Sequence, residues 1–345
     1  MRNLLIVPIV AALAVAPLFA GPGVAGACAC GAVLTDERLV AVQETALVEV
    51  AGGTQAITLN IATETQATEA AFIMPVPARA EFTLADGAVF TELDEISAPR
   101  VEYRDVEKPD GEGAGEAPPG SGVTVTDHVA VGPYDVAQLT GADSGAVAGW
   151  LATNGFDLPP DLAGALTPYL AEGWLVVAVR LTPEEEAATF EGGLPPMRFT
   201  FPATEPVYPM RLSATAEYAQ PFRLYVLADH RMNISNPAPG DDDAELTYAG
   251  WVAPGDLADY PVVAELVTER RFLTRYDALF DPEKLTDDIH LTQAATDDSY
   301  RAVVVETRYV NGSLFGEIVW WVLGILAVLG LFMWLLAIST RRVRH

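Results

Sequence analysis

The two cysteines of this chain stand one residue apart, as Cys28-Ala29-Cys30. Thiols of an exported protein tend to be oxidised or otherwise capped. A disulfide across a single residue closes a small, strained ring that is reduced more easily than an ordinary structural bridge. Three roles stay open for the pair. We favour a local or intermolecular disulfide over acylation of Cys28 and over redox or metal chemistry. Two sulfurs are too few for a zinc site, which needs four ligands.

Three arginines form the second candidate group, Arg198, Arg211 and Arg223. Period-two alternation predicts that they point away from the core, whereas the residues between them face it: Met197, Phe199, Phe201, Met210 and Leu212. In a chain with 47 acidic residues, such a row could bind a carboxylate or phosphate bidentately. The simpler interpretation is structural ion pairing with nearby acids, namely Glu184–Glu186, Glu205 or Glu217.

The histidines give no catalytic pattern. Apart from the C-terminal residue they are His128, His230 and His290, and His230 follows Asp229 without a visible nucleophile. Spacings typical of zinc proteases, serine hydrolases and nucleotide-binding loops do not occur. Residues 241–245 imitate the start of a calcium loop but lack its glycine and closing glutamate, which favours a solvated turn. The sequence therefore predicts no catalytic residue, no metal and no cofactor.

The elements that position these residues are mostly strands. Alternation on both sides of Gly52-Gly53 predicts a hairpin. Residues 71–77 predict a third strand, whose prolines place it at a sheet edge or at a strand end. Helices are predicted over about 87–97, 143–154 and 159–173. Further strand patterns occur at 123–126, 134–139, 174–179, 197–230, 246–252, 271–276, 289–293 and 302–309. We expect an α+β fold with mostly antiparallel sheet.

The two ends of the chain have the patterns of a signal peptide and of a membrane anchor. Arg2, an apolar run and Ala25-Gly26-Ala27 predict a cleaved signal peptide over 1–27, with Cys28 as the first mature residue. Ile318–Ile338 has no charge and is long enough to span roughly 30 Å as a helix. We therefore expect a transmembrane helix over 314–339 and a basic cytoplasmic tail over 340–345, which makes the protein a single-pass type I protein of the cell membrane.

The predicted extracellular domain, 28–313, is strongly acidic. It carries 16 basic against 46 acidic residues, about 30 negative charges in excess. This charge repels nucleic acid and anionic lipid head groups, which excludes nucleic acid as an expected partner. Cation binding is possible, although a solvated acidic surface is the simpler interpretation. Within the domain, residues 107–122 are rich in glycine, proline and glutamate and predict a flexible loop.

Several motifs resemble one bacterial family, in which proteins are secreted or membrane-anchored. They are Ala27–Gly31, Phe72–Pro77, Tyr169–Trp174 leading to Arg180, Tyr208–Ser213, and Leu224–Arg231. The family is called domain of unknown function 2330, and the resemblance covers roughly 28–310. It implies export, paired N-terminal cysteines and one extended domain. It implies no activity and no catalytic residue.

Two classes of function follow from these observations. The first is a non-catalytic surface protein that binds or holds an envelope partner. The second is a surface enzyme, either a hydrolase or a thiol-redox protein that uses Cys28 and Cys30. A pocket that holds a nucleophile together with His230 or His290 would favour the enzyme, and a closed sheet surface with exposed apolar patches would favour binding.

Overall fold

The computed structural model of the chain describes residues 24–107, 135–139, 144–181, 189–236, 244–310 and 314–342, apart from residues 29, 36, 38 and 191. Most of the predicted signal peptide therefore lies outside the described residues. The same holds for most of the predicted loop 107–122, the predicted strand 123–126, His128, Glu184–Glu186 and the acidic turn 241–243.

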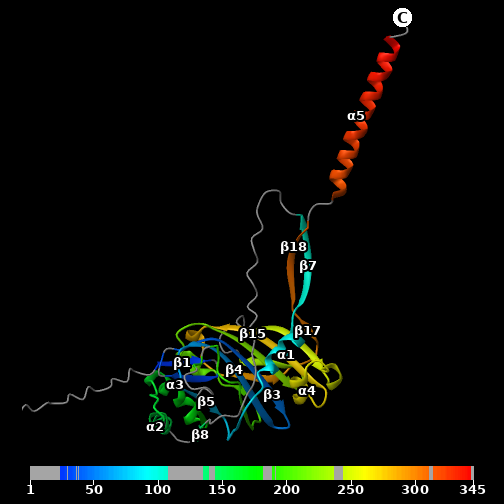
Figure 1. Ribbon diagram of the computed structural model, residues 1–345. Helices are drawn as coiled ribbons and strands as arrows, with labels where there is room; N and C mark the ends of the chain where they lie inside the picture. The colour runs from blue at the N-terminus through cyan, green and yellow to red at the C-terminus, as the bar shows by residue number, and fades with distance from the viewer. Residues whose placement is uncertain are drawn as a thin grey trace, which may run out of the picture. The chain divides into compact units, whose positions relative to one another are not determined.

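The chain divides into two compact units. The first comprises residues 1–98 and 125–301, and the second comprises residues 99–124 and 302–345. Within the described residues, the first unit holds the two large sheets and most helices (Figure 1). The second unit holds one strand pair and one helix.

Two large sheets make up the first unit. One has the strand order β1-β2-β5-β9-β8, and the other has the order β17-β14-β15-β12-β3-β4-β10-β6. Their strands are β1 (Val24–Cys28), β2 (Gly31–Thr35), β3 (Leu39–Ala51), β4 (Thr54–Thr65), β5 (Ala70–Val76), β6 (Glu81–Leu84), β8 (Asp135–Leu139), β9 (Leu175–Leu181), β10 (Met197–Pro202), β12 (Gln220–Ala228), β14 (Ala244–Val252), β15 (Arg271–Phe280) and β17 (Tyr300–Arg301). Neighbouring strands run antiparallel except for β12 and β3. The predicted α+β class with mostly antiparallel sheet is confirmed.

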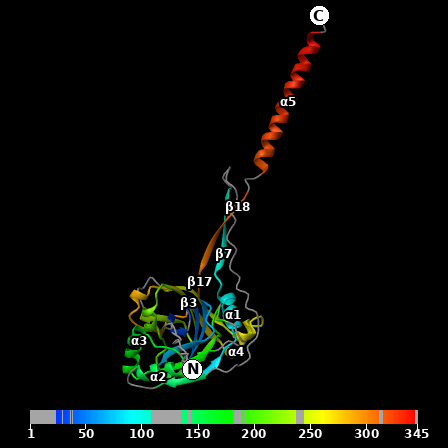
Figure 2. The same cartoon turned by 60° about the vertical axis from the view of Figure 1, so that its left-hand side comes forward.

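Apolar side chains on both faces of each sheet produce four layers. The central core lies between the sheets, where Phe72 of β5 and Phe199 of β10 bring their ring centroids to 5.9 Å. The outer face of the five-stranded sheet packs on α2 (Gly145–Thr153) and α3 (Pro160–Ala171). The outer face of the eight-stranded sheet packs on α1 (Ala88–Ser97) and α4 (Pro261–Leu266). Figure 2 shows the two helix pairs on opposite sides of the strands.

A small third sheet and three short helical turns complete the first unit. The sheet has the order β11-β16-β13, with β11 (Val207–Tyr208), β16 (Ile289–Gln293) and β13 (Met232–Asn236). The 3-10 turns are η1 (Arg211–Thr215), η2 (Pro254–Asp256) and η3 (Pro282–Lys284). Buried residues of this sheet, among them Tyr208, Ile289 and Leu291, extend the central core.

The predicted hairpin is confirmed. Ala51 pairs with Thr54 across a two-residue turn, and Gly52 and Gly53 have φ angles of 56° and 78°. Both angles lie in the left-handed region, which glycine enters without steric cost. The predicted helices over 87–97, 143–154 and 159–173 correspond to α1, α2 and α3.

Residues 71–77 form the predicted strand, and its prolines lie at the strand end, on either side of its last residue, Val76. The alternative of a sheet edge is wrong. β5 lies inside its sheet, between β2 and β9, and is buried along its length. Its pairing with β2 ends at Ile73, whereas Pro75 pairs only with β9. Proline is therefore tolerated here because no strand on the β2 side needs its missing N–H. β2 stops at Gly31, where any Cβ would lie 2.4 Å from the Ile73 carbonyl oxygen.

The second unit contains β7 (Arg100–Glu107), β18 (Val303–Val310) and α5 (Leu314–Arg342). The two strands pair in parallel, and Val303 lies beside Arg100 at the start of the register. Among the described residues, no helix meets the length and apolarity that crossing a membrane requires.

Candidate functional site

The three predicted arginines do not form one row. Arg198 lies on β10 and Arg223 on β12, strands of the same sheet that β3 and β4 separate. The sequence of residues 209–213, Pro-Met-Arg-Leu-Ser, resembles that of residues 196–200, Pro-Met-Arg-Phe-Thr. Residues 197–200 form a strand, however, whereas Arg211 begins the 3-10 turn η1. Met210 and Leu212 are buried as predicted, but they belong to different apolar clusters. The repeat in the sequence is therefore not a repeat in the structure.

Each of these arginines contacts acidic side chains of the chain itself. Arg198 forms an ion pair with Glu49 and donates a hydrogen bond to the Thr58 hydroxyl at 3.0 Å. Arg223 Nε lies 2.6 Å from Asp277 Oδ1, and its Nη1 lies 2.8 Å from Asp94 Oδ1. These contacts favour structural ion pairing, although with acids other than those that the sequence suggested.

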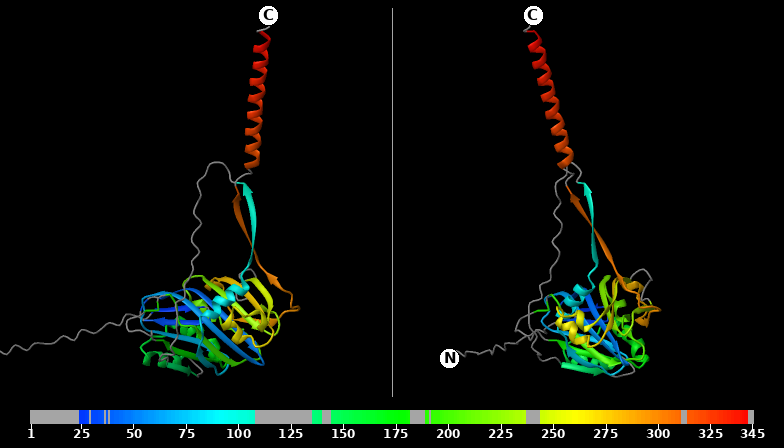
Figure 3. Two further views of the ribbon diagram at one scale, coloured as in Figure 1. Left: turned by 45° about the vertical axis from the view of Figure 1, so that its right-hand side comes forward. Right: turned by 90° about the vertical axis from the view of Figure 1, so that its right-hand side faces the viewer.

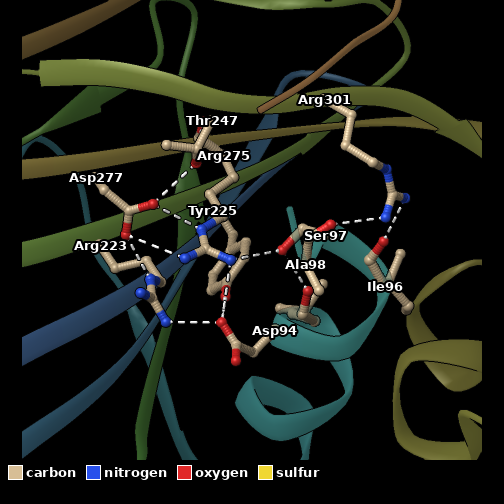
Figure 4. Close-up of polar contacts among 11 residues, drawn as sticks. Asp94, Ile96, Ser97, Ala98, Arg223, Tyr225, Thr247, Arg275, Asp277 and Arg301 are labelled. Carbon is tan, nitrogen blue, oxygen red and sulfur yellow. Dashed lines mark hydrogen bonds and ion pairs between the residues drawn. The ribbon is translucent and has the colours of Figure 1, made fainter. Parts of the chain in front are cut away.

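Arg223 belongs to a polar network between α1 and the eight-stranded sheet (Figure 4). Its centre is Arg275 of β15, which is 6% exposed. Arg275 donates to Asp94 at 3.0 Å, to the Ser97 hydroxyl at 3.1 Å and to Asp277 at 2.8 Å. Asp94 and Ser97 lie on one turn of α1, so this arginine fastens the helix to the sheet.

The arginines of this network control its titration. Burial alone would raise the pKa of Asp277, but hydrogen bonds from Arg223 and Arg275 lower it below its ordinary value. Burial raises the pKa of the Tyr225 hydroxyl to about 12. The network therefore keeps Asp277 ionised and Tyr225 neutral, and the carboxylates of Asp94 and Asp277 occupy the donors that an anionic ligand would need.

A second buried centre joins the motifs that resemble the bacterial family. Asp288, immediately before β16, has a fully buried side chain. Its Oδ1 accepts hydrogen bonds from the Tyr169 hydroxyl and from the Met210 and Arg211 backbone N–H groups, the last two at 2.7 Å and 3.3 Å. Arg211 Nη2 lies 3.1 Å from Asp288 Oδ2. Asp288 thus ties α3, η1 and β16 together.

The side chains around Asp288 continue outward to the surface. The Arg211 guanidinium lies 4.7 Å from the centre of the Tyr169 ring and pairs with Glu172 at 2.6 Å. Trp174 lies on the ring of Tyr169 with a centroid distance of 4.9 Å. Burial raises the pKa of Asp288 and, more strongly, that of Tyr169. Asp288 therefore holds the ring of Tyr169, against which Trp174 packs.

Trp174 lines one of two adjoining clefts. The first, about 360 Å³, is formed by Gly53, Pro77, Trp174, Pro202, Ala203, Thr204, Glu205, Val207 and His290. The second, about 480 Å³, is formed by Thr204, Glu205, Pro206, Met232, Ser235, His290, Leu291, Thr292 and Gln293. They share Thr204, Glu205 and His290, so the two hollows adjoin at these residues.

Hydrogen bonds to the backbone hold two residues that line the first cleft, Val207 and Ala203. The fully buried Gln55 side chain donates to the Val207 carbonyl at 2.6 Å and accepts from the Val207 N–H at 3.0 Å. The Ala203 N–H donates to the Gly53 carbonyl at 3.0 Å. The side-chain amide of Gln55 therefore bonds both backbone groups of Val207, which pairs with His290 of β16.

His290 has few of the partners that catalysis would need. The Ser235 hydroxyl donates to the His290 backbone carbonyl at 3.2 Å rather than to its imidazole. His230 instead pairs with Asp297 at 2.9 Å on an exposed surface. Within the described ranges, no group of three or more potential metal-binding side chains is found. The part of the chain that the structure describes thus lines the clefts with apolar side chains and a few polar groups.

The cysteine pair is described only in part. Cys28 ends β1, which pairs with β2 so that Cys28 lies opposite Gly31, but its side chain lies outside the described residues. Cys30 is fully buried beside the Tyr208 hydroxyl, which also contacts Glu44. Burial and the neighbouring Cys30 and Glu44 raise the pKa of Tyr208 well above its ordinary value. The disulfide, acylation and redox roles stay predictions.

The polar network of α1 gives a test of stability. We expect Arg275→Met to lower the free energy of unfolding by about 2–4 kcal/mol at pH 7, because it leaves Asp94 and Asp277 with one cation. The folded pKa of Asp277 lies below its unfolded value of about 3.9, so this stabilisation is present above that pH and is lost as the pH falls. The deficit of the variant should therefore shrink below about pH 4.

Denaturant unfolding between pH 3.5 and 7 measures this effect. Arg270→Met is the matched control, since Arg270 is an exposed arginine that lies over Trp251 at 3.9 Å. It should change stability by less than about 1 kcal/mol. A deficit for Arg275→Met that is absent, or equal at every pH, would contradict the role assigned to the network.

The Asp288 centre gives a second test. We expect Tyr169→Phe to lower the free energy of unfolding by about 1–3 kcal/mol, because a buried carboxylate loses one of its donors. Tyr218→Phe serves as the control, since Tyr218 is 56% exposed and its hydroxyl should be worth less than about 0.5 kcal/mol. Equal stability of the two variants in urea titrations would show that the Tyr169 hydroxyl does not hold this centre together.

Comparison with known proteins places the chain in a family. No curated protein matches it. Among solved structures, the crystal structure of baculovirus P35 matches with a TM-score of 0.37 and 10% sequence identity, over 74% of this chain and 97% of that one. The bacterial family DUF2330, described as an uncharacterized protein conserved in bacteria, matches residues 24–292. That match covers most of the chain, so the protein belongs to this family, as its sequence motifs indicated.

Proposed function

We propose that this protein is a non-catalytic binding protein of the bacterial cell surface, anchored by its C-terminus. The observation that carries the proposal is the pair of adjoining clefts that share Thr204, Glu205 and His290. Their volumes, about 360 and 480 Å³, lie in the range of ligand sites. The clefts hold apolar and aromatic surface with a few polar groups, which suits recognition.

The lining of the clefts favours an extended segment of another envelope protein. Trp174, Pro77 and Pro202 offer flat apolar surfaces on which aliphatic or proline side chains can pack. Glu205 is exposed, and the whole chain has a net charge of −27. A neutral or basic segment would therefore approach more readily than an acidic one.

The anchor in this proposal rests on the sequence. The uncharged stretch Ile318–Ile338 is followed by Arg341, Arg342 and Arg344, and positive residues favour the cytoplasmic side. Trp320 and Trp321 begin this stretch, where aromatic rings prefer the membrane surface. In this orientation the large acidic domain lies on the extracellular side of the membrane, where it can meet other envelope proteins.

A surface hydrolase is the alternative. The observation that favours it is that His290 shares a cleft with the hydroxyl groups of Thr204 and Ser235. A histidine can activate a hydroxyl only within hydrogen-bond reach. The Ser235 hydroxyl is directed to the His290 carbonyl oxygen instead, so we place binding first.

Variants of the cleft test the proposed function. Full-length protein, solubilised from membranes, should capture a specific envelope protein, and Trp174→Ala should reduce this capture at least about tenfold through loss of apolar contact. Trp251→Ala is the matched control, since Trp251 packs on Phe272 on another strand of the first unit. Thermal unfolding of both variants separates a lost contact from a lost fold.

The same proteins should show no turnover of ester, phosphate, glycoside or peptide substrates. Turnover that His290→Ala abolishes would establish the enzyme and overturn the binding proposal. Capture that Trp174→Ala and Trp251→Ala weaken equally would show that the clefts are not the binding surface.

The anchor has its own test. Protease added to intact spheroplasts should digest residues 28–313 and leave a C-terminal fragment that begins near Leu314, because the bilayer shields only the apolar segment. An epitope after His345 should be reached by protease only after the membrane is broken. Protection of the large domain in intact spheroplasts would contradict the type I orientation.

A further inference from the structure

We propose that the strand pair of the second unit is a self-association surface, which joins two copies of this chain by antiparallel pairing of β18 with β18. This inference is independent of the cleft proposed above. It rests on the exposure of the strand pair and on the order of charges along β18.

β7 and β18 form a sheet of two strands in the described structure. Both views of Figure 3 show the two strands side by side, and among the described residues no third strand pairs with either of them. Each strand has eight residues. Each outer edge therefore offers a long row of backbone N–H and C=O groups that no strand of the described chain pairs with.

A strand pair of this kind is marginal by itself. Two-stranded sheets are barely stable in water, and parallel pairs are slightly weaker than antiparallel ones and are normally buried. Here the strands instead expose large apolar side chains: Val101 42%, Tyr103 62%, Val303 41%, Val304 45% and Val305 49%. Pairing with further strands would satisfy the open edge and set these side chains beside cross-strand neighbours.

The charges of β18 select the partner and the register. Antiparallel pairing of two copies about a two-fold axis at Thr307 places Glu306 opposite Arg308 of the other copy, twice by symmetry. The same register places Val304 opposite Val310 and Val305 opposite Tyr309. Opposite charges and β-branched or aromatic pairs are the cross-strand combinations that stabilise sheets.

Neighbouring registers are unfavourable. A two-fold axis at Glu306 sets that carboxylate against its own copy, and an axis at Arg308 sets two guanidinium groups together. An axis at Val305 places Val304 opposite Glu306. Among the registers with an axis at residues 305–308, the one at Thr307 is therefore the one that sets opposite charges against each other.

The geometry also limits how anchored copies can meet. Antiparallel strands require a two-fold axis perpendicular to the strand direction. Two copies in one membrane would therefore lay their strand pairs along its surface, whereas copies in facing membranes could meet directly. The strand pairing itself is the same in both cases.

A charge-exchange experiment tests the partner. Full-length protein in detergent is studied by sedimentation velocity over a range of concentrations. The wild type should form dimers, and Glu306→Arg and Arg308→Glu should each weaken dimerisation by about tenfold or more, because each sets like charges opposite one another. An equimolar mixture of the two variants should restore the dimer, because both cross-strand pairs of the mixed dimer then join one cationic and one acidic side chain.

A cross-link tests the register. Thr307→Cys should form an intermolecular disulfide under mild oxidation, because residues on the two-fold axis have Cβ atoms about 4.5–5.5 Å apart. Wild type treated in the same way controls for bridges through Cys28 and Cys30, and Arg104→Cys on β7 controls for random contact. Peptide mass analysis identifies the bridge.

Each outcome decides the proposal. A wild type that stays monomeric, or single variants that dimerise as tightly as the wild type, would overturn it. So would a dimer that Thr307→Cys does not cross-link above the level of Arg104→Cys, because the copies would then associate through another part of the chain. Dimerisation restored only in the mixture, together with the Thr307→Cys bridge, would establish the pairing of β18 with β18.

Discussion

Both large sheets carry apolar side chains on both faces, and this constraint determines the arrangement of the first unit. A sheet with two apolar faces must be covered twice. The inner faces cover one another, for example where Phe72 meets Phe199, and each outer face needs helices. Val147 and Leu166 supply this cover on one side, and Phe90 and Leu93 supply it on the other. The four layers follow from the pattern of burial rather than from any single contact.

Four layers bury polar groups that must then find partners inside the protein. A buried carboxylate without donors is costly. The fully buried Asp288 accepts from Tyr169 and two backbone N–H groups, and the half-buried Asp277 accepts from two arginines. Each centre fastens a covering helix, α3 in the first case and α1 in the second. The polar networks therefore fix which helix covers which sheet.

Local elements could be predicted from the sequence because their signals are local. Gly52-Gly53 between alternating strands specifies a hairpin, and the apolar spacing at Phe90 and Leu93 specifies a helix. The acids that pair with the arginines could not be predicted in this way. Asp94 lies 129 and 181 residues from Arg223 and Arg275, and no spacing rule connects such positions. The sequence therefore predicted one row of arginines paired with nearby glutamates, whereas the arginines lie apart and pair with other acids.

Two further sequence patterns have physical explanations. Proline favours a sheet edge or a strand end, and here the strand end applies: Pro75 lies next to the last residue of an interior strand, beyond the point where pairing with β2 ends. The sequence of residues 209–213 resembles that of residues 196–200, yet it forms the turn η1. The backbone N–H groups of Met210 and Arg211 there donate to Asp288 instead of to a neighbouring strand. The first cleft could not be predicted from the sequence either, since Trp174 and His290, which both line it, come from distant segments. The motif Tyr169–Trp174 was the one sequence signal close to it.

The layers cover the faces of the sheets but not their edges, and the edges of the two units differ. In the first unit several edge strands are very short: β17 and β11 have two residues each, and β6 has four. Short edges offer little backbone for pairing and guard against unwanted association. β7 and β18 have eight residues each, and no strand of the described chain pairs with their outer edges. Among the described strands, β7 and β18 thus offer longer open edges than the edge strands of the first unit, which is the arrangement expected if this pair serves association.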